Sequence, residues 1–499
     1  MKLLSIAKVC LLSCLLLIGV SYDLGATELP PLLLEAGDQD LRDDLRWLND
    51  QGVIQLSTAS WPLSYGAVYH ALSSADLTKG DVADRQLVKR LLSAMENRLG
   101  PLKAVASASI QSEQLALGGF SVHDRGSSVQ SIALSSSTSS FAGTLMFNHL
   151  SDPATLKQSS GNLAGSYLAT SLFGQTVYIG QLNHWWGPGS DGSLQWSSAA
   201  TPIAGVGLKR GAEGAPENKY LSFIGPWSYE LFLGQLQHDE TAPGVRIFGL
   251  RVQAQPIHGL EIGLSRMFEW GGSGADASFS SFKDSLLGNG NNESTGGAVS
   301  NEVSGFDAQY TGMLFGSPLS VYAQLIGEDE AGKLPSQYIG LVGARYQHRV
   351  DGMRVIWTVE AADTESHRLF GFGSGGKTGI AYRHDTFYRD GFYHDGMPIA
   401  HYLGGDGKSQ SAAVVIVPTE EAHGLRYMLR YEHASINESS QTINMMYPLA
   451  DTIQQVEGTV SGGARLMSYN VKWSLGLTGR HSQQDGNTAG VSGSVAVNF

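Results

Sequence analysis

The stretch Gly490–Phe499 reads GVSGSVAVNF and decides the fold. Successive side chains of an extended strand point to opposite faces, so one face carries Val491, Val495 and Phe499. The other face carries small or polar side chains, among them Ser492 and Ser494. A strand of this kind that ends on phenylalanine is typical of a bacterial outer-membrane β-barrel. It predicts a wall that meets lipid on one side and a polar lumen on the other.

The first residues predict export through a secretory signal peptide. Lys2 and Lys8 form a short basic region, and an apolar run extends from there to Val20. This run is too short to be a membrane-spanning helix, and Ala26 could end a cleavage site. We therefore place the signal peptide at residues 1–26.

Composition excludes several classes of function. The only cysteines, Cys10 and Cys14, lie in the predicted signal peptide, so the mature chain would have no disulfide, cysteine nucleophile or thiolate metal site. The net charge is −13 and no basic stripe is present, so we expect no nucleic-acid partner. We also expect no cofactor and no metal.

Residues 27–103 have a helical periodicity. Leu41, Leu45 and Leu48 recur at the spacing of one helix face. Candidate helix-capping residues are Asp38, Ser64 and Asp81, and candidate stops are Gly52 and Gly100-Pro101. The segment predicts a small unit of three helices. Because so small a unit has little core of its own, we expect it to dock on the barrel.

Residues 104–499 have the alternation of barrel strands. Leu429 and Tyr431, for example, alternate with Arg430 and Glu432, as expected for a strand with lipid outside and a charged lumen inside. At about 22 residues for each strand and its connection, this length predicts an antiparallel transmembrane β-barrel of roughly 18 strands. Gly288–Gly305 is predicted to be a long loop. A soluble array of β-sandwiches is the rival fold, but it would not explain the signal peptide, the terminal Phe and the lack of cysteine together.

The densest motif begins at Gln181 and reads QLNHWWGPGSDGSL. Adjacent Trp185 and Trp186 would face opposite ways on a strand, and Gly-Pro-Gly would then break it. An inward tryptophan beside Asp191 could stack on a sugar ring while polar groups bind its hydroxyls. The alternative is that both tryptophans anchor the barrel at the membrane interface and that Gly-Pro-Gly is only a tight turn.

The second dense stretch runs from Tyr382 to Asp406 and mixes aromatic side chains with Arg383, Asp385 and Asp406. Arginine forks and stacking rings suit an acidic or neutral polysaccharide. Three alternatives compete with this interpretation. The candidate metal ligands are His384, His394 and His401, although they lack metal-binding spacing. The second alternative is a Ser/His/Asp hydrolase, although the sequence has no Gly-x-Ser-x-Gly elbow. The third, which is as compatible as ligand binding, is a solvated network that only holds a loop in the lumen.

These motifs resemble the capsule-assembly Wzi family. The resemblance rests on HWWGPGSDGSL and the following Trp196-Ser-Ser-Ala-Ala-Thr-Pro-Ile and Leu208-Lys-Arg. It extends to the helical segment with Arg46-Trp-Leu-Asn-Asp and Ser60-Trp-Pro, and to Pro398-Ile and Leu403-Gly-Gly-Asp. The resemblance spans essentially the whole mature chain, and Trp-Trp-Gly-Pro-Gly is its most specific part.

The resemblance implies an outer-membrane barrel with a helical bundle at its periplasmic end. It implies a lectin-like role without catalysis, in which capsular polysaccharide or exopolysaccharide is attached to the cell surface. The expected partners are that polysaccharide and outer-membrane lipid, with the barrel a monomer. The candidate polysaccharide-binding residues are Trp185, Trp186, Asp191, Arg383, Asp385 and Asp406. The rival functions are a passive porin and a barrel hydrolase.

Overall fold

The computed structural model describes most of the chain from Leu29 to Phe499. The described ranges are 29–112, 117–121, 126–211, 214–215, 220–237, 241–288, 300–330, 335–367, 381–384, 387–419, 424–439, 445–466 and 469–499. The predicted signal peptide therefore lies outside the described residues. None of the described helices is both long and apolar enough to cross a membrane.

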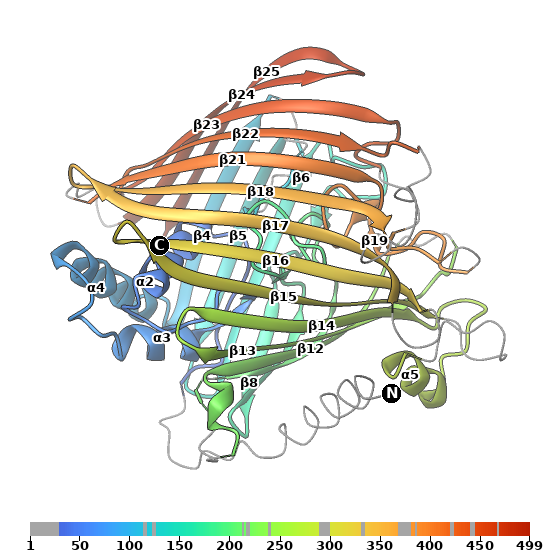
Figure 1. The fold of residues 1–499 in the computed structure, drawn as a ribbon, viewed down its shortest axis with the longest axis horizontal. Coiled ribbons are helices and arrows are strands. Elements are labelled where there is room, and N and C mark those ends of the chain that lie inside the picture. The colour runs from blue at the N-terminus through green and yellow to red at the C-terminus, as the bar shows by residue number, and fades with distance from the viewer. Residues whose placement is uncertain are drawn as a thin grey trace.

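Most of the described strands form one closed antiparallel barrel (Figure 1). Its strands are β4 (Gly100–Gln111), β5 (Ser128–Ser137), β6 (Phe141–Ser151), β7 (Gly161–Asn162), β8 (Tyr167–Leu172), β9 (Gln175–Gly180), β11 (Gly205–Arg210), β12 (Trp227–Gln235), β13 (Arg246–Ile257), β14 (Leu260–Trp270), β15 (Ser300–Leu314), β16 (Ser317–Glu330), β17 (Pro335–Val350), β18 (Met353–His367), β21 (Gly407–Pro418), β22 (Arg426–Ile436), β23 (Asp451–Leu466), β24 (Tyr469–Ser482) and β25 (Gly486–Asn498). β7 and β8 both pair with β6 and share one position in the wall, which gives 18 strand positions. The predicted strand count is confirmed.

The last strand closes the barrel, as its sequence predicts. β25 pairs with β4, with Val495 opposite Ala108. Phe499 lies beside Tyr469 with the ring centroids 5.1 Å apart, and its backbone N–H donates to the carbonyl of Ala104. The closed ladder leaves no free sheet edge in the membrane and rules out the β-sandwich alternative.

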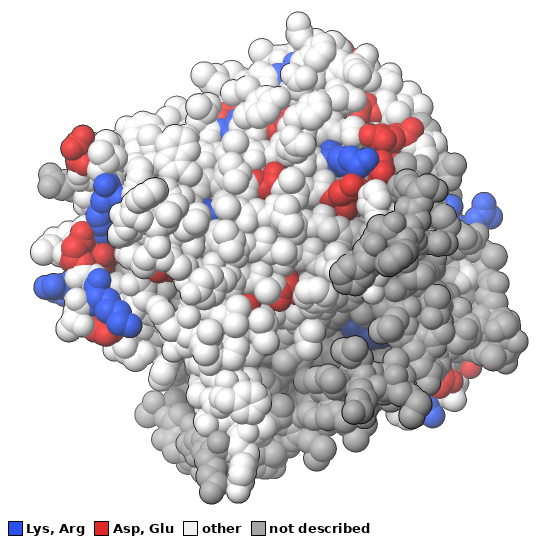
Figure 2. Space-filling view, viewed as in Figure 1, with Lys and Arg blue, Asp and Glu red and all other residues white. Residues whose placement is uncertain are grey.

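The predicted alternation of side chains is also confirmed. On β22, Leu429 is 54% exposed on the outer face, whereas the adjacent Arg430 is 7% exposed and points into the lumen. The face seen in Figure 2 is largely free of Lys, Arg, Asp and Glu, which gather toward the two ends of the barrel. The outer surface is therefore suited to lipid.

The two ends of the barrel differ. At one end, tight turns join neighbouring strands, such as Phe315-Gly316 between β15 and β16 and Asp351-Gly352 between β17 and β18. At the other end most connections are long, such as residues 236–245 between β12 and β13, although only residues 483–485 join β24 to β25. The predicted loop Gly288–Gly305 is wrong in part, because β15 starts at Ser300; residues 289–299 lie outside the described residues. Ser300–Gly305 is rich in polar and small residues, so the start of β15 lacks the apolar alternation by which a barrel strand is recognised in a sequence.

The N-terminal segment forms a bundle of three helices at the short-turn end (Figure 1). Its helices are α2 (Gln39–Asp50), α3 (Tyr65–Ser73) and α4 (Val82–Glu96), accompanied by the short strands β1 (Leu33–Leu34), β2 (Ser60–Trp61) and β3 (Leu63–Ser64). Asp38 caps α2, and Asp81 forms a reciprocal capping box with Asp84 at the start of α4. Ser64 stands at the start of α3, but its hydroxyl donates to the carbonyl of Gly211 instead of capping the helix.

Acidic side chains of α2 bind arginines of the inner barrel wall. Asp50 Oδ2 accepts from Arg345 Nη2 at 2.8 Å and from Gln347 Nε2 at 2.8 Å, both on β17. Arg426 of β22 pairs with three aspartates of α2, with its Nε 2.8 Å from Asp40. Asp50 and Arg345 side chains are 1% and 2% exposed, so water does not screen this pair. The bundle therefore docks on the barrel as expected, and ion pairs with the inner wall hold it in place.

We predict that Asp50→Asn loosens the bundle. The substitution leaves the buried guanidinium of Arg345 without its counter-charge, which typically costs about 3 kcal/mol. Thermolysin should cleave residues 29–99 of the purified variant at a lower temperature than in the wild type. Asp76→Asn is the matched control, because Asp76 is exposed in the same bundle. Equal cleavage temperatures for wild type and Asp50→Asn would contradict the role of this pair.

Candidate functional site

The Trp-Trp-Gly-Pro-Gly motif lies inside the barrel. Trp185 and Trp186 form the short strand β10 (Trp185–Trp186), which pairs with β2 of the bundle. The peptide N–H of Gly187 donates to the carbonyl of Ala59 at 2.8 Å. The motif is therefore the point where the bundle joins the lumen of the barrel.

The two tryptophans face opposite ways, as their adjacency predicts, and both are fully buried. Trp185 packs on the bundle side against Phe120, with the ring centroids 5.3 Å apart. Its indole ring also lies 4.9 Å from the guanidinium carbon of Arg42. Neither tryptophan reaches the outer surface, so the alternative that both anchor the barrel at the membrane interface is wrong.

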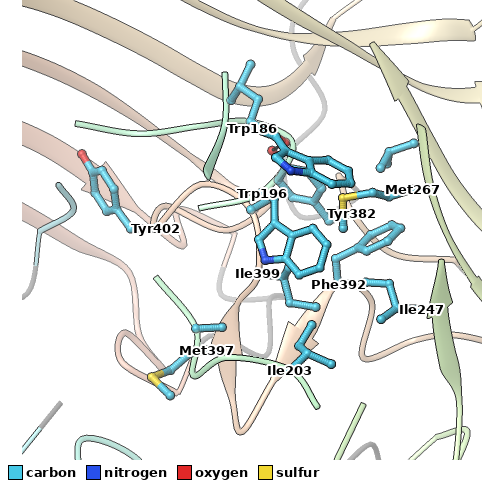
Figure 3. Close-up of a cluster of buried hydrophobic side chains, with 14 of the residues drawn as sticks. Trp186, Trp196, Ile203, Ile247, Met267, Tyr382, Phe392, Met397, Ile399 and Tyr402 are labelled. Carbon is cyan, nitrogen blue, oxygen red and sulfur yellow. Dashed lines mark hydrogen bonds between the residues drawn. The ribbon is translucent and has the colours of Figure 1, made fainter. Parts of the chain in front are cut away.

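Trp186 belongs to an aromatic core that fills the lumen (Figure 3). Its ring meets Trp196 edge to face at 5.1 Å, and its Nε1 donates to Glu230 Oε2 at 3.3 Å. The second dense stretch packs against the same core through Tyr382, Phe392, Met397, Ile399 and Tyr402. The two motifs singled out in the sequence therefore form one unit.

Hydrogen bonds join the two motifs directly. Tyr382 Oη donates to the carbonyl of Leu194 at 2.8 Å. The N–H of Ser197 donates to the carbonyl of Ile399 at 2.9 Å. The second stretch also contains the two-residue strands β19 (Tyr393–His394) and β20 (Met397–Pro398), which pair with each other. It folds back into the lumen as a compact inner layer.

The remaining candidate residues of the second stretch differ in burial. Asp406 is fully buried, and its Oδ2 accepts from the N–H of Ser439 at 2.8 Å, so it holds the segment after β22. Arg383 is half-buried. Asp385 lies outside the described residues. Among the described residues, the one group of three close metal-ligating side chains is Asp363, Glu365 and His367, so His384, His394 and His401 do not converge on a metal position.

A wall carboxylate orders the turn that follows the tryptophans. Glu360 of β18 accepts hydrogen bonds from three consecutive backbone N–H groups at residues 190–192, at 2.6, 3.0 and 3.0 Å. It also accepts from Tyr322 Oη at 2.8 Å. On the opposite side, Arg46 Nη2 of α2 donates to the carbonyl of Pro188 at 2.8 Å. The turn is thus fixed between the bundle and the barrel wall.

Asp191 leaves this turn and lines a cavity of about 680 Å³. Its Oδ1 lies 3.2 Å from Arg430 Nε, and its Oδ2 accepts from the hydroxyl of Ser411. The cavity lies between α2, the turn and the inner wall of β4–β6 and β22–β25. Its hydroxyl and amide lining includes Ser107, Ser109, Asn148, Ser474, Ser492 and Ser494, and its charged lining includes Asp43, Arg426, Arg430, Glu457 and Lys472.

Most of these cavity residues were missed as site candidates. Ser494 and Ser474, whose hydroxyl oxygens lie 2.6 Å apart, face inward from neighbouring strands. The signal was present in the period-two alternation, because every second residue of these strands must face the lumen. The alternation does not show which strands are neighbours. Only the pairing of β4, β24 and β25 brings their serines to one part of the wall.

His401 is a buried histidine under the turn. Burial lowers its pKa to about 3, so the ring is neutral near pH 7. Its Nδ1 accepts from the N–H of Leu403 at 3.3 Å. A Cβ at Gly192 would lie 2.0 Å from His401 Nε2, so only glycine allows the turn to pack on this ring.

We predict that His401 makes the protein sensitive to acid. The unfolded chain binds a proton at this position near pH 6.5, while the folded chain does so only near pH 3. Stability is therefore fully present above about pH 6.5 and falls as pH drops, by about 1.4 kcal/mol per pH unit for one proton. His401→Gln should remove this part of the slope in denaturant unfolding followed by tryptophan fluorescence. His70→Gln, at an exposed position of α3, should keep it; identical slopes for both variants would contradict the assignment.

Comparison with known proteins places this geometry in a family. The model of the family described as capsule assembly protein Wzi matches residues 102–486. A Klebsiella pneumoniae protein, described as an uncharacterized 55.8 kDa protein in the cps region, is 32% identical over 486 residues, which are 97% of this chain and 92% of that protein.

A solved structure shares the whole architecture. It is Wzi, described as an outer-membrane protein involved in group 1 capsule assembly in Escherichia coli and as a carbohydrate-binding β-barrel. It is 30% identical, covers 94% of this chain and 99% of its own, and superimposes with a TM-score of 0.79. The chain belongs to the capsule assembly protein Wzi family and is an outer-membrane β-barrel.

Proposed function

We propose that this protein is a non-enzymatic, lectin-like barrel that holds capsular polysaccharide or exopolysaccharide at the bacterial surface. The observation that carries the proposal is the likeness, over 94% of the chain, to a solved barrel described as carbohydrate-binding. Retention of a polymer needs no reaction. It needs repeated weak contacts, whose combined strength grows with the number of repeats bound.

The contents of the lumen favour binding over passive conduction. α2 and the Trp186 core occupy the interior of the described barrel, and both are attached to its wall by buried charges and hydrogen bonds. A general porin keeps an aqueous channel through its barrel. The filled lumen therefore supports a rigid binding platform and argues against the porin alternative.

The cavity beside Asp191 is the position that we propose for glycan contact. Serine hydroxyls, asparagine amides and carboxylates match sugar hydroxyls as donors and acceptors. Arg430 and Lys472 add positive charge for acidic sugars. A volume of about 680 Å³ suits a short stretch of saccharide.

The other candidate residues divide by burial. We propose that Trp185, Trp186 and Asp406 act structurally, because each is fully buried among protein partners. Arg383, which is half-buried, stays a predicted glycan contact. Asp385 stays a prediction from the sequence alone.

The orientation of the barrel follows from its connections. Bacterial outer-membrane barrels have short periplasmic turns and long extracellular loops. The helical bundle lies at the short-turn end, so we propose that it faces the periplasm and that a signal peptide at residues 1–26 directs export. The bundle was predicted to span residues 27–103, but the barrel strand β4 already begins at Gly100. We further propose that the barrel acts as a monomer in outer-membrane lipid.

Loss of the protein should release polysaccharide from cells. In a strain that lacks the gene, we expect unchanged total polymer and a shift of polymer from the washed-cell pellet to the medium. The quantity to measure is the polymer content of both fractions, with the wild-type gene restored as the control. An unchanged distribution between pellet and medium would refute surface attachment.

Filling the cavity should weaken glycan binding. Ser494→Trp adds a large side chain to the cavity wall, and we expect oligosaccharide affinity of the purified barrel to fall about tenfold, the effect of about 1.4 kcal/mol. The matched control is Val491→Trp, because Val491 lies on the same strand, is 58% exposed on the outer face and does not line the cavity. Affinity can be measured by calorimetry with fragments of the cell's own polymer. If Ser494→Trp binds as well as Val491→Trp does, glycan contact lies elsewhere.

A further inference from the structure

Helix α5 (Phe279–Leu286) lies against the outer side of the barrel wall, which was expected to meet only lipid. On β14, Met267 and Glu269 face the lumen, so the alternating Phe268 and Trp270 point outward. Phe282 of α5 packs on both outward rings, with centroids 5.5 and 5.2 Å away. Figure 1 shows α5 at the long-loop end of the barrel, beside the ends of β14 and β15.

α5 is bound to an outward-facing ion pair. Arg266 of β14 and Glu302 of β15 also lie on the outer face, yet their side chains are only 14% and 3% exposed. Arg266 Nη2 donates to the carbonyl of Ser285, in the last turn of α5, at 2.7 Å. Trp270 Nε1 donates to Ser281 Oγ at 3.0 Å. A charged pair that faces lipid is costly. Because α5 covers this pair and hydrogen-bonds to Arg266 and Trp270, the helix is packed firmly on the outer wall.

The side of α5 that is turned away from the barrel wall is exposed, and it is apolar with one basic side chain. Phe279 is 81% exposed and Leu287, which follows the helix, is 38% exposed. Lys283 is exposed one helical turn after Phe279 and therefore lies on the same side. The outward surface of the neighbouring strands, with Leu264 51% and Phe306 52% exposed, faces lipid.

The height of α5 on the barrel matches the membrane boundary. Trp270 stands opposite Arg246 at the last rung of the β13–β14 ladder. The guanidinium carbon of Arg246 lies 4.9 Å from the centre of its ring. Tryptophan and basic side chains are typical of the interface between acyl chains and headgroups.

We propose that α5 is an interfacial helix that binds the outer leaflet. Phe279 and Leu287 enter the acyl region, and Lys283 binds the phosphorylated headgroup of a lipid. Interfacial helices lie in the membrane plane and combine an apolar face with basic residues. A helix fixed to the wall at this height would also set the depth of the barrel in the membrane.

The proposal can be tested with a fluorescent label at residue 279. Because both cysteines of the chain lie in the predicted signal peptide, Phe279→Cys provides a single labelling site. Phe306→Cys is the lipid-facing reference, and Asp485→Cys, at an exposed position of the β24–β25 turn, is the aqueous reference. Each labelled mature protein, which lacks Cys10 and Cys14, is placed in phosphatidylcholine vesicles that contain nitroxide-labelled phosphatidylglycerol or nitroxide-labelled phosphatidylcholine.

We expect lipid-borne nitroxide to quench the label at 279, as at 306, and aqueous iodide to quench only the label at 485. The anionic nitroxide lipid should quench position 279 more than the neutral one, with a local enrichment of up to about fivefold for one basic side chain. Lys283→Gln should remove this excess, and Lys89→Gln, on α4 of the bundle, should not.

Three results would overturn the proposal. Quenching at 279 by iodide alone would place α5 in water. Protection from both quenchers would mean that protein, such as a second copy of this chain, covers the helix. Equal quenching by the two nitroxide lipids, with no change in Lys283→Gln, would show that Lys283 does not bind a headgroup.

Discussion

The attachment of an acidic helix to basic residues of the inner wall is the constraint on which the rest of the structure depends. α2 carries four aspartates in contact with β16, β17, β18 and β22, and Asp50 alone receives bonds from Arg345, Gln347 and Ser320. Inside a barrel these charges are shielded from solvent, so leaving either partner unpaired would be costly. The wall and the helix therefore specify each other's position.

The position of α2 in turn fixes the position of the Trp-Trp-Gly-Pro-Gly motif. Arg42 and Arg46 lie on the same helix as the aspartates, and both donate to backbone carbonyls of the Gly187–Gly189 turn. Burial lowers the pKa of Arg46 to about 10, with the nearby Arg345 adding to the effect, yet the guanidinium stays charged near pH 7. Glu360 holds the following amides from the other side. Hence the turn that carries Asp191 is held by opposite charges from the bundle and the barrel.

The sequence predicts the parts of this fold that depend on local rules. Period-two alternation predicts the barrel strands, and Asp38 and Asp81 cap their helices as expected. Helix α5 escaped prediction, since its apolar residues are divided between packing on the wall through Phe282 and exposure through Phe279. The early part of β15 escaped for a related reason: outward-facing Glu302 pairs with Arg266 beside α5 rather than facing lipid. Local patterns assume that the outer face meets lipid, and here it meets protein.

The candidate site shows the same division. Composition identifies both dense motifs, but the bond between Ser197 and Ile399 joins residues far apart in the chain, which no spacing rule predicts. Composition also leaves the role of the tryptophans open between a sugar platform and a structural part, and in the structure their rings pack against Phe120 and Trp196. Their burial has a consequence for polymer retention. A rigid, filled lumen keeps the cavity of Asp191, Ser474 and Ser494 in one shape. A preformed site loses little conformational entropy with each sugar that binds, so many weak contacts can add along a polymer.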